Sequence, residues 1–201
     1  MITRFPLVRL LFALALLFVL ALPASACVGK TLVIGSAGTL QQDLLAQMLN
    51  LLISERTGTT VKVVRYDSAT QAHDALMDAD LDILVEYTGI AQVTVLKGEG
   101  LGDAEALFKA VKDGYNQKYN LIWLTPFGFD EASLAPAESI PAQAAPVVRK
   151  DTLKKFPALA RLIKKLGGAV SGEAMATLEK EAQGGDIQGV ARRFLKNGRY
   201  I

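Results

Sequence analysis

Two short stretches of the chain carry side chains that could contact a ligand. Residues 35–42 follow an apolar run and lead into a helical pattern, so their backbone N–H groups would favour an anion such as a carboxylate. Residues 86–89 (Glu-Tyr-Thr-Gly) follow another apolar run, where the ring face of Tyr87 could attract a cation. The alternative for Tyr87 is an aromatic ring packed at the start of a helix. Both stretches would lie beyond the carboxyl ends of strands, where parallel α/β sheets bind ligands.

Residues that would support catalysis are missing from the sequence. His73 is the only histidine, and neither a second histidine nor a cysteine accompanies it, so we expect it to face solvent on a helix. The chain has no G-x-S-x-G, P-loop or G-x-G-x-x-G motif. The sequence therefore predicts a protein that is not an enzyme and holds neither a cofactor nor a metal ion.

The elements that would position these stretches alternate between strands and helices. Apolar, β-branched runs predict strands, and apolar residues at helical spacing from Leu40 to Ile53 predict a long helix after the first strand. Asp67 or Ser68 is expected to cap the second helix. This order predicts a parallel sheet with right-handed crossovers. The predicted strands are 30–35, 60–66 and 81–85, and the predicted helices are 40–53 and 67–77.

The second half of the chain is predicted to complete one α/β domain. A helix is expected over 86–96, another after Asp103, and a strand over 121–124. Residues 126–145 contain three prolines among alanine, serine and glutamate, which indicates a loop or linker. A strand over 146–148 and helices starting near 151, 157, 171 and 186 follow. We therefore expect an α/β fold with a mostly parallel sheet of about five strands flanked by helices.

The N-terminus has the three parts of a secretory signal peptide over residues 1–26. Arg4 and Arg9 precede a wholly apolar run that is shorter than the roughly 20 residues needed to span a bilayer. Small residues end the segment directly before Cys27, the only cysteine. Cys27 is then either lipidated after cleavage or left near a free N-terminus. Both outcomes place the protein in the periplasm or another extracytoplasmic compartment, and lipidation would also anchor it to a membrane.

The charge balance excludes one class of partner. The chain has 22 basic and 20 acidic residues, and removal of residues 1–26 would leave 20 of each. Because nucleic-acid binding needs a basic face, we expect no nucleic-acid partner. Residues 27–201 have the length of one domain.

Several segments together resemble the substrate-binding proteins of glycine betaine, choline and carnitine ABC transporters. They are TLVIGS at 31–36, DILVEYTG at 82–89, PFGF at 126–129 and APVVRKDTLKKFPAL at 145–159. The resemblance implies a type II periplasmic-binding-protein-like fold, whose two α/β lobes close on a quaternary ammonium ligand within a box of aromatic rings. In this family, closure of the two lobes is the signal that the membrane permease recognises. Here the linker 130–144 stands where the resemblance places the second lobe, so we expect a single lobe over residues 27–201.

The resemblance assigns ligand binding to three residues of this chain. Gln42 matches a glutamine at the start of the family's first helix, and Tyr87 and Thr88 match its Glu-Tyr-Thr-Gly motif. The family's more polar turn is replaced by residues 37–40, and its tyrosine after the PFGF motif has no counterpart. The aromatic rings of the second lobe are missing with that lobe. One tyrosine over an exposed cation contributes about 0.5–1 kcal/mol, so half a cage is expected to bind weakly.

Two functions follow from the resemblance. The first is the extracytoplasmic solute-binding component of an ABC importer, with an inner-membrane permease and a small quaternary ammonium solute as partners. A second protomer or a separately encoded lobe would then cover the open face. The second is a lobe-deleted accessory or interaction protein that no longer binds ligand alone. An apolar open face would favour a partner, whereas a polar, charged face would suit a monomer exposed to solvent. Leu124, Phe127 and Phe129 near the hinge are compatible with an apolar face, and the sequence alone does not decide between the two.

Overall fold

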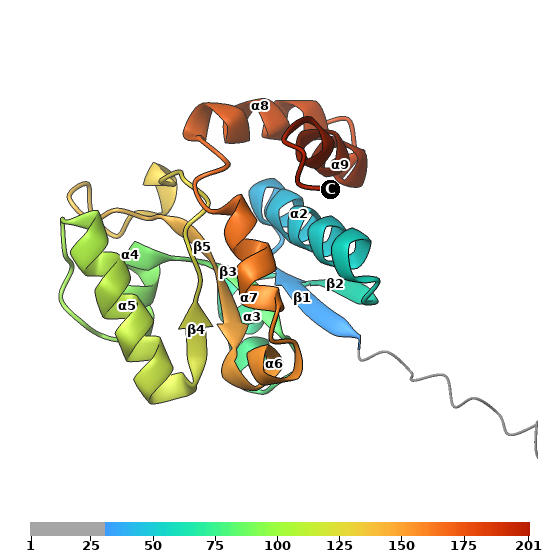
Figure 1. The fold of residues 1–201 in the computed structure, drawn as a ribbon. Coiled ribbons are helices and arrows are strands. Elements are labelled where there is room, and N and C mark those ends of the chain that lie inside the picture. Colours follow the sequence, from blue (N-terminus) through green and yellow to red (C-terminus); the bar gives the residue numbers. More distant parts are fainter. Residues whose placement is uncertain (1–30) are drawn as a thin grey trace, which may run out of the picture. The chain divides into compact units, whose positions relative to one another are not determined.

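The computed structural model describes residues 31–201, so the predicted signal peptide and Cys27 lie outside the described residues. The described chain forms a five-stranded sheet in the order β2-β1-β3-β5-β4, with helices on both faces (Figure 1). Strands β1, β2 and β3 are parallel, whereas β5 is antiparallel to both β3 and β4. Four strands therefore share one direction, which confirms the predicted α/β fold and mostly parallel sheet. The strands span Leu32–Ser36 (β1), Val61–Arg65 (β2), Ile83–Tyr87 (β3), Leu121–Trp123 (β4) and Ala144–Arg149 (β5).

Five helices begin where the sequence supplies a capping side chain. Thr39, Ser68, Asp103, Ser171 and Asp186 each accept a hydrogen bond from the backbone N–H three residues later. No helix of the described part is long and apolar enough to cross a membrane. The helices span Leu40–Thr57 (α2), Ala69–Met77 (α3), Thr88–Ile90 (α4), Ala104–Tyr119 (α5), Lys150–Lys155 (α6), Leu159–Ile163 (α7), Gly172–Ala182 (α8) and Ile187–Asn197 (α9), and the other helical turns are Ala91–Val95 (η1, π-helical), Ala132–Leu134 (η2) and Lys164–Leu166 (η3).

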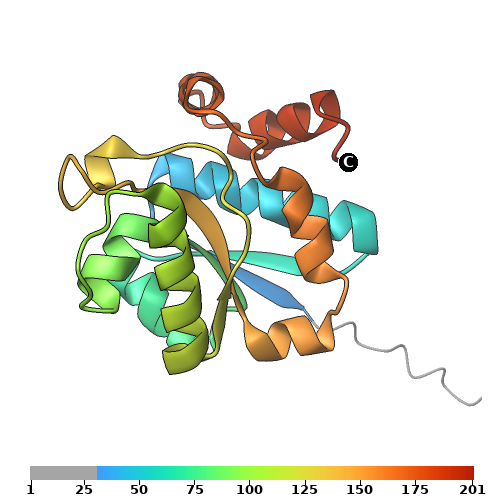
Figure 2. The same ribbon diagram turned by 60° about the vertical axis from the view of Figure 1, so that its left-hand side comes forward.

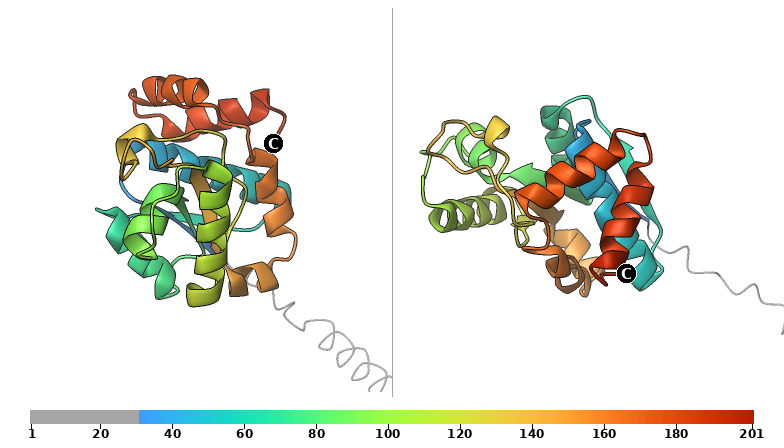
Figure 3. Two further views of the ribbon diagram at one scale, coloured as in Figure 1. Left: turned by 90° about the vertical axis from the view of Figure 1, so that its left-hand side faces the viewer. Right: turned by 90° about the horizontal axis from the view of Figure 1, so that it is seen from above.

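Different helices cover the two faces of the sheet, as Figures 2 and 3 show. One hydrophobic cluster contains residues of α2, α7, α8 and α9, and the other contains residues of α3, η1 and α5. Along β3 the side chains alternate: Ile83, Val85 and Tyr87 belong to the first cluster and Leu84 to the second. Glu86 shares the orientation of Leu84 and points toward α3 and α5.

Strand β3 runs two residues further than the sequence predicts. It ends at Tyr87, which pairs with Ala144 of β5, so residues 86 and 87 are strand residues and not the start of a helix. The helical turn begins only at Thr88. The predicted end of the strand was wrong because the pairing that extends it comes from a strand almost sixty positions away in the sequence. As a consequence, the adjacent side chains of Glu86 and Tyr87 lie on opposite faces of the sheet.

Residues 124–143 connect β4 to β5, so the predicted linker 130–144 includes the first residue of β5, and from residue 130 the connection passes beside the turn that follows β3. They contain the turn η2 and one isolated bridge between Asp130 and Gln143, and they form no sheet of their own. The two ends of this segment also bond to each other, since Glu131 N donates to Ala142 O at 3.0 Å. The segment therefore closes on itself as an ordered loop.

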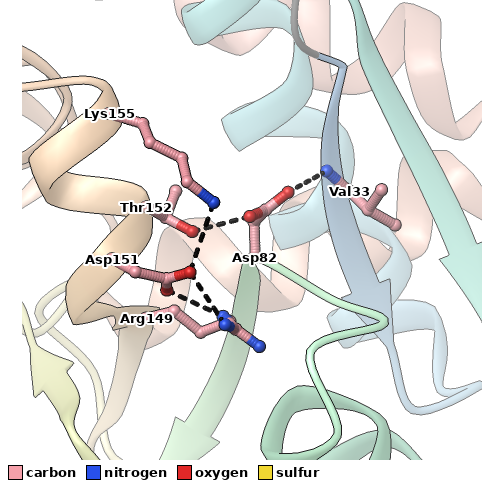
Figure 4. A network of polar contacts seen from close by, with 6 residues as sticks. All are labelled: Val33, Asp82, Arg149, Asp151, Thr152 and Lys155. Atoms are coloured by element: carbon pink, nitrogen blue, oxygen red, sulfur yellow. Dashed lines mark hydrogen bonds and ion pairs between the residues drawn. The ribbon is translucent and has the colours of Figure 1, made fainter.

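A polar network fastens the amino-terminal end of β3, opposite to the end where a ligand is expected (Figure 4). The Asp82 carboxylate accepts hydrogen bonds from the Val33 backbone N–H at 2.9 Å and from the buried Thr152 hydroxyl at 2.6 Å. Arg149 donates two hydrogen bonds to Asp151, at 3.0 and 2.9 Å. The Arg149 guanidinium holds the pKa of the Asp151 carboxyl well below its usual range. These contacts join β1, β3, β5 and α6 and fix the sheet that positions the site.

Candidate functional site

Gln42 lies at the carboxyl ends of β1 and β3, where the residue is 4% exposed. Its amide Nε2 donates to the Val85 carbonyl at 3.0 Å, and its Oε1 accepts a hydrogen bond from the Ala37 backbone N–H at 3.4 Å. Both ends of the amide are therefore used to hold α2 against the two strands. Gln42 therefore lies at the carboxyl ends of the strands, where its amide holds α2 in place.

The N-terminus of α2, predicted to attract an anion, already has a carboxylate beside it. The Ser36 hydroxyl donates to Asp43 at 2.5 Å, and Arg65 lies 3.3 Å from the other oxygen of that carboxylate. A negative charge in the first turn of a helix complements the partial positive charge of the helix end. A ligand carboxylate at this place would meet the like charge of Asp43, so this stretch is less suited to anion binding than its sequence suggests.

The Tyr87 ring is packed in the hydrophobic cluster on the α2 side of the sheet, and the residue is 6% exposed. Its hydroxyl donates to Gln41 Oε1 at 2.5 Å, and Gln41 Nε2 donates in turn to Glu131 Oε2 at 2.7 Å. Burial raises the pKa of the Tyr87 hydroxyl well above its usual value. Of the two interpretations of Tyr87, the structure supports the packed aromatic ring, since little of the residue is open to a ligand.

Thr88 is fully buried beneath the loop 130–144. Its hydroxyl donates to the Pro141 carbonyl at 3.3 Å and accepts a hydrogen bond from the Gln143 backbone N–H at 3.0 Å. A Cβ atom on Gly89 would lie only 2.7 Å from Pro136 Cδ and 2.7 Å from the Pro141 oxygen. The loop thus packs directly on the Glu-Tyr-Thr-Gly turn, on the side where the resemblance implies a cleft.

This packing can be tested with Gly89→Ala. We expect the substitution to lower the free energy of unfolding by about 1–3 kcal/mol, because the added methyl group must push the loop away. Gly172→Ala is a matched control, since nothing lies within 4 Å of a Cβ at that position and alanine favours the helix. Urea unfolding of both variants measures the difference. Equal stability of the two variants would contradict the close packing of the loop.

Of the two kinds of open face considered near the hinge, the described residues show no exposed apolar one. Phe127 is fully buried, Phe129 is 6% exposed, and Leu124 is half-buried. Among the large apolar side chains of the described residues, only Met77 is exposed. The loop 130–144 and the C-terminal helices supply the partners that cover these side chains.

A cavity of about 350 Å³ opens on the other face of β3, between α3, η1 and α5. Its inner wall includes the buried Leu84, Val85 and Tyr115, and its rim includes the exposed Thr94 and Lys97. Two of the three residues assigned by sequence also line it, whereas Thr88 does not. The complete lining is Ala37, Gln42, Ala69, Thr70, His73, Leu84, Val85, Glu86, Tyr87, Ile90, Ala91, Thr94, Val95, Lys97 and Tyr115.

His73 and Glu86 form a pair within this cavity. His73 Nδ1 lies 2.6 Å from Glu86 Oε1, and the two side chains are only 17% and 11% exposed. The imidazole also packs edge-on against Tyr115 and Tyr119, with ring centroids 6.0 and 6.3 Å away. The hydrogen bond to Glu86 raises the pKa of His73 above its usual value.

The expectation that His73 faces solvent is therefore wrong. Helix α3 buries Ala72, Ala75 and Leu76, and His73 lies at the edge of this stripe, where α5 and β3 enclose it. The alternation of side chains along β3 could have indicated the contact between Glu86 and His73. It places Glu86 on the same face of the sheet as Leu84, which is the face that α3 covers. This alternation can be used only if β3 is known to continue to Tyr87, because the sequence predicts a helix from residue 86.

Three buried polar atoms near this cavity have no hydrogen-bond partner among the described residues. They are Glu86 Oε2, the Tyr115 hydroxyl oxygen and Trp123 Nε1. Glu86 and Tyr115 line the cavity directly. The Tyr115 hydroxyl lies next to the Glu86 carboxylate, because burial and then this carboxylate raise the pKa of that hydroxyl well above its usual value. A carboxylate in largely apolar surroundings favours a cationic group.

Comparison with known protein families gives one clear match. The model of the substrate-binding domain of ABC-type glycine betaine transport systems matches residues 30–138 and 130–197. The carnitine transport binding protein OpuCC of Listeria monocytogenes is 30% identical over 128 residues, which are 63% of this chain and 38% of that protein. The ergothioneine transport permease/ergothioneine binding protein EgtU of Helicobacter pylori is 29% identical over 110 residues, 54% of this chain and 20% of that protein. This chain therefore matches less than half the length of either relative.

Solved structures share the fold. The crystal structure of a glycine betaine/carnitine/choline ABC transporter superposes with a TM-score of 0.78 at 19% identity, covering 85% of this chain and 98% of that one. Apo YehZ from Escherichia coli superposes with a TM-score of 0.74 at 16% identity, covering 86% of this chain and all of that one. At these identities the superpositions establish the architecture alone.

Proposed function

This chain belongs to the family of substrate-binding domains of ABC-type glycine betaine transport systems, and from this we propose that it is the extracytoplasmic solute-binding component of an ABC importer. Its solutes would be quaternary ammonium compatible solutes of the glycine betaine, choline and carnitine type, and its partner an ABC permease in the inner membrane. Residues 1–26 would direct export, after which Cys27 is either lipidated or left unmodified. The mass of the exported protein distinguishes these two forms.

One observation carries the proposal. The cavity at the carboxyl ends of β1 and β3 is bordered by Gln42 and Tyr87, two of the residues that the family resemblance assigns to ligand binding, and the Tyr87 ring itself packs on the α2 side of the sheet. Its volume of about 350 Å³ suits a small solute, because ligand pockets generally begin at about 300 Å³. Ligands of open α/β sheets bind at this end of the strands. The carboxylate of Glu86 supplies the negative charge that a cationic solute requires.

Calorimetric titration with choline, glycine betaine and carnitine tests the proposal. At least one is expected to bind more tightly than about 100 µM. Thr94→Trp, which places a large side chain at the cavity rim, is expected to weaken binding by about ten-fold or more through steric exclusion. Thr177→Trp on α8 serves as the control, since Thr177 is exposed on a helix and does not line the cavity. No heat at millimolar ligand would exclude a receptor that works alone.

A lobe-deleted accessory protein remains the second candidate, and one observation favours it. The loop 130–144 covers Thr88 and Gly89, and the Tyr87 hydroxyl is already bonded to Gln41. In that case the solutes would not bind to the chain alone at any concentration. Binding that emerges only as the protein concentration rises would instead indicate that a second protomer completes the site. If a separately encoded lobe completes the site, binding would be seen only after that lobe is added.

A further inference from the structure

We propose that the open edge of strand β4 is a docking site for an acidic, extended segment of a partner protein, which joins the sheet as an additional strand beside β4. The inference goes beyond solute binding. The groove along this edge shares no lining residue with the solute cavity, so the two sites can be tested separately.

Strand β4 has a neighbour on one side only, because it is the last strand in the order β2-β1-β3-β5-β4. Its pairing with β5 is antiparallel and matches Ile122 with Val148. The Leu124 N–H donates to the Pro146 carbonyl at 2.9 Å, so residues 122 and 124 direct their backbone groups toward β5. The alternation of an antiparallel ladder then directs the N–H and C=O of Trp123 toward the open edge. An extended chain can pair with such an edge.

A groove of about 310 Å³ follows this edge, between α5 on one side and α7 with η3 on the other (Figure 1). Its lining includes the half-buried side chains of Phe108, Ile122 and Leu124 and the buried Trp123. The backbone edge of β4 is thus accompanied by apolar surface on which a strand could bury side chains of its own. A groove with a pairing edge and apolar surface suits an extended peptide.

The charged side chains of this groove are all basic. Lys112 comes from α5, whereas Arg161 and Lys164 come from α7 and η3 on the opposite side. All three are exposed, and none of them forms an ion pair within the described residues. No acidic residue of the described part lines the groove. Because side chains of a strand point alternately to its two faces, carboxylates on both faces of a docked segment would meet these cations.

The same cations argue against a second copy of this chain as the occupant. Pairing of β4 with β4 across a two-fold axis would bring two sets of three cations together, and like charges facing each other are destabilising. The other edge strand, β2, carries Lys62 and Arg65 on the strand itself, a common protection against pairing. Residues 121–123 of β4 carry no charge. The flanking cations therefore discriminate against basic partners and favour acidic ones.

Trp123 is the only tryptophan of the chain and lines the groove, so its fluorescence reports binding there. The probe is the end-capped peptide Glu-Val-Glu-Glu-Val-Glu, whose glutamates point to both faces of an extended strand. At low ionic strength it is expected to bind the unmodified protein with a Kd of about 100 µM or tighter, and added salt should weaken it. A peptide with lysine in place of each glutamate should bind at least about ten-fold more weakly.

A third peptide, with proline in place of both valines, separates strand pairing from charge attraction. It keeps every carboxylate but lacks two backbone N–H groups, so it should bind about ten-fold or more weakly than the first peptide. Equal binding of the proline peptide would show attraction by charge alone and overturn the inference. Binding of the lysine peptide as tight as that of the acidic one would overturn it as well.

Variants of the groove provide an independent measurement. Arg161→Glu combined with Lys164→Glu should weaken the acidic peptide by about ten-fold or more, whereas Lys62→Glu on β2 should leave its affinity unchanged. Circular dichroism verifies that the variants fold. Unchanged affinity in the folded double variant, or binding to phosphatidylglycerol vesicles without binding to the peptide, would contradict the inference. Solute titration of the double variant should match that of the unmodified protein, so failure of peptide binding leaves the proposed function standing.

Discussion

Replacing Tyr87 with alanine is expected to lower the free energy of unfolding by about 3–5 kcal/mol, because it removes an aromatic ring from a packed core. The residue is 6% exposed and belongs to the cluster that joins β3 to α2. The substitution also removes the donor that bonds Gln41 Oε1 at 2.5 Å. Urea unfolding followed by circular dichroism measures the loss.

Tyr87→Phe is the matched control for this prediction. It keeps the ring and removes only the hydroxyl, so the expected loss is about 1 kcal/mol. Solute binding should then persist in Tyr87→Phe, whereas in Tyr87→Ala it should weaken in proportion to the fraction of unfolded protein. If Tyr87→Ala were as stable as the unmodified chain and lost only solute binding, the ring would act in recognition and its place in the core would be refuted.

Replacing Phe127 with alanine is expected to cost a similar amount, about 3–5 kcal/mol. The ring is fully buried, and the backbone around it joins three segments. Its N–H donates to the Ala144 carbonyl at 2.9 Å, and its carbonyl accepts a hydrogen bond from the Val170 N–H at 3.0 Å. A cavity at this position would loosen the contact between β5 and the C-terminal helices. Thermal and urea unfolding both report it.

Phe108→Ala is the comparison, since Phe108 is a half-buried ring on the other face of the sheet and makes one edge-to-face contact with Trp123. Its loss is expected to be about 1–2 kcal/mol, because less apolar surface is removed from contact. Comparing Phe127→Ala with Phe108→Ala also distinguishes the solute-binding function from the protein-interaction function. A stable Phe127→Ala variant that lost a protein partner would show that the hinge region is a docking surface and not part of the core.

The secondary structure was predictable where it depends on neighbouring residues in the sequence. The strand and helix patterns place most elements within a few residues of their observed bounds, and Ser68, Asp103, Ser171 and Asp186 cap helices where the sequence indicated starts. The order of the elements also predicted the α/β class, since alternating strands and helices form parallel sheets with crossovers. The antiparallel direction of β5 lay outside this rule, because its pairing depends on how the loop 130–144 returns to the sheet.

The candidate site was only partly predictable. Gln42 and Tyr87 do lie at the carboxyl ends of the strands, but their polar groups are bonded within the protein. The His73–Glu86 pair was missed because the two residues come from different elements, and the register of β3 against β5 decides which way Glu86 points. A composition or spacing pattern contains no information about that register when the partner strand is distant in the sequence.

The sequence by itself determined the secondary-structure elements, their caps and the family to which the chain belongs, because hydrophobic periodicity, capping residues and short motifs act over a few neighbouring positions. Only the tertiary structure decided which of the candidate residues are free to meet a ligand. Burial depends on contacts between segments far apart in the chain, and the loop 130–144 covers Thr88 while α5 encloses His73. The same packing leaves Glu86 at a cavity with one carboxylate oxygen unpartnered.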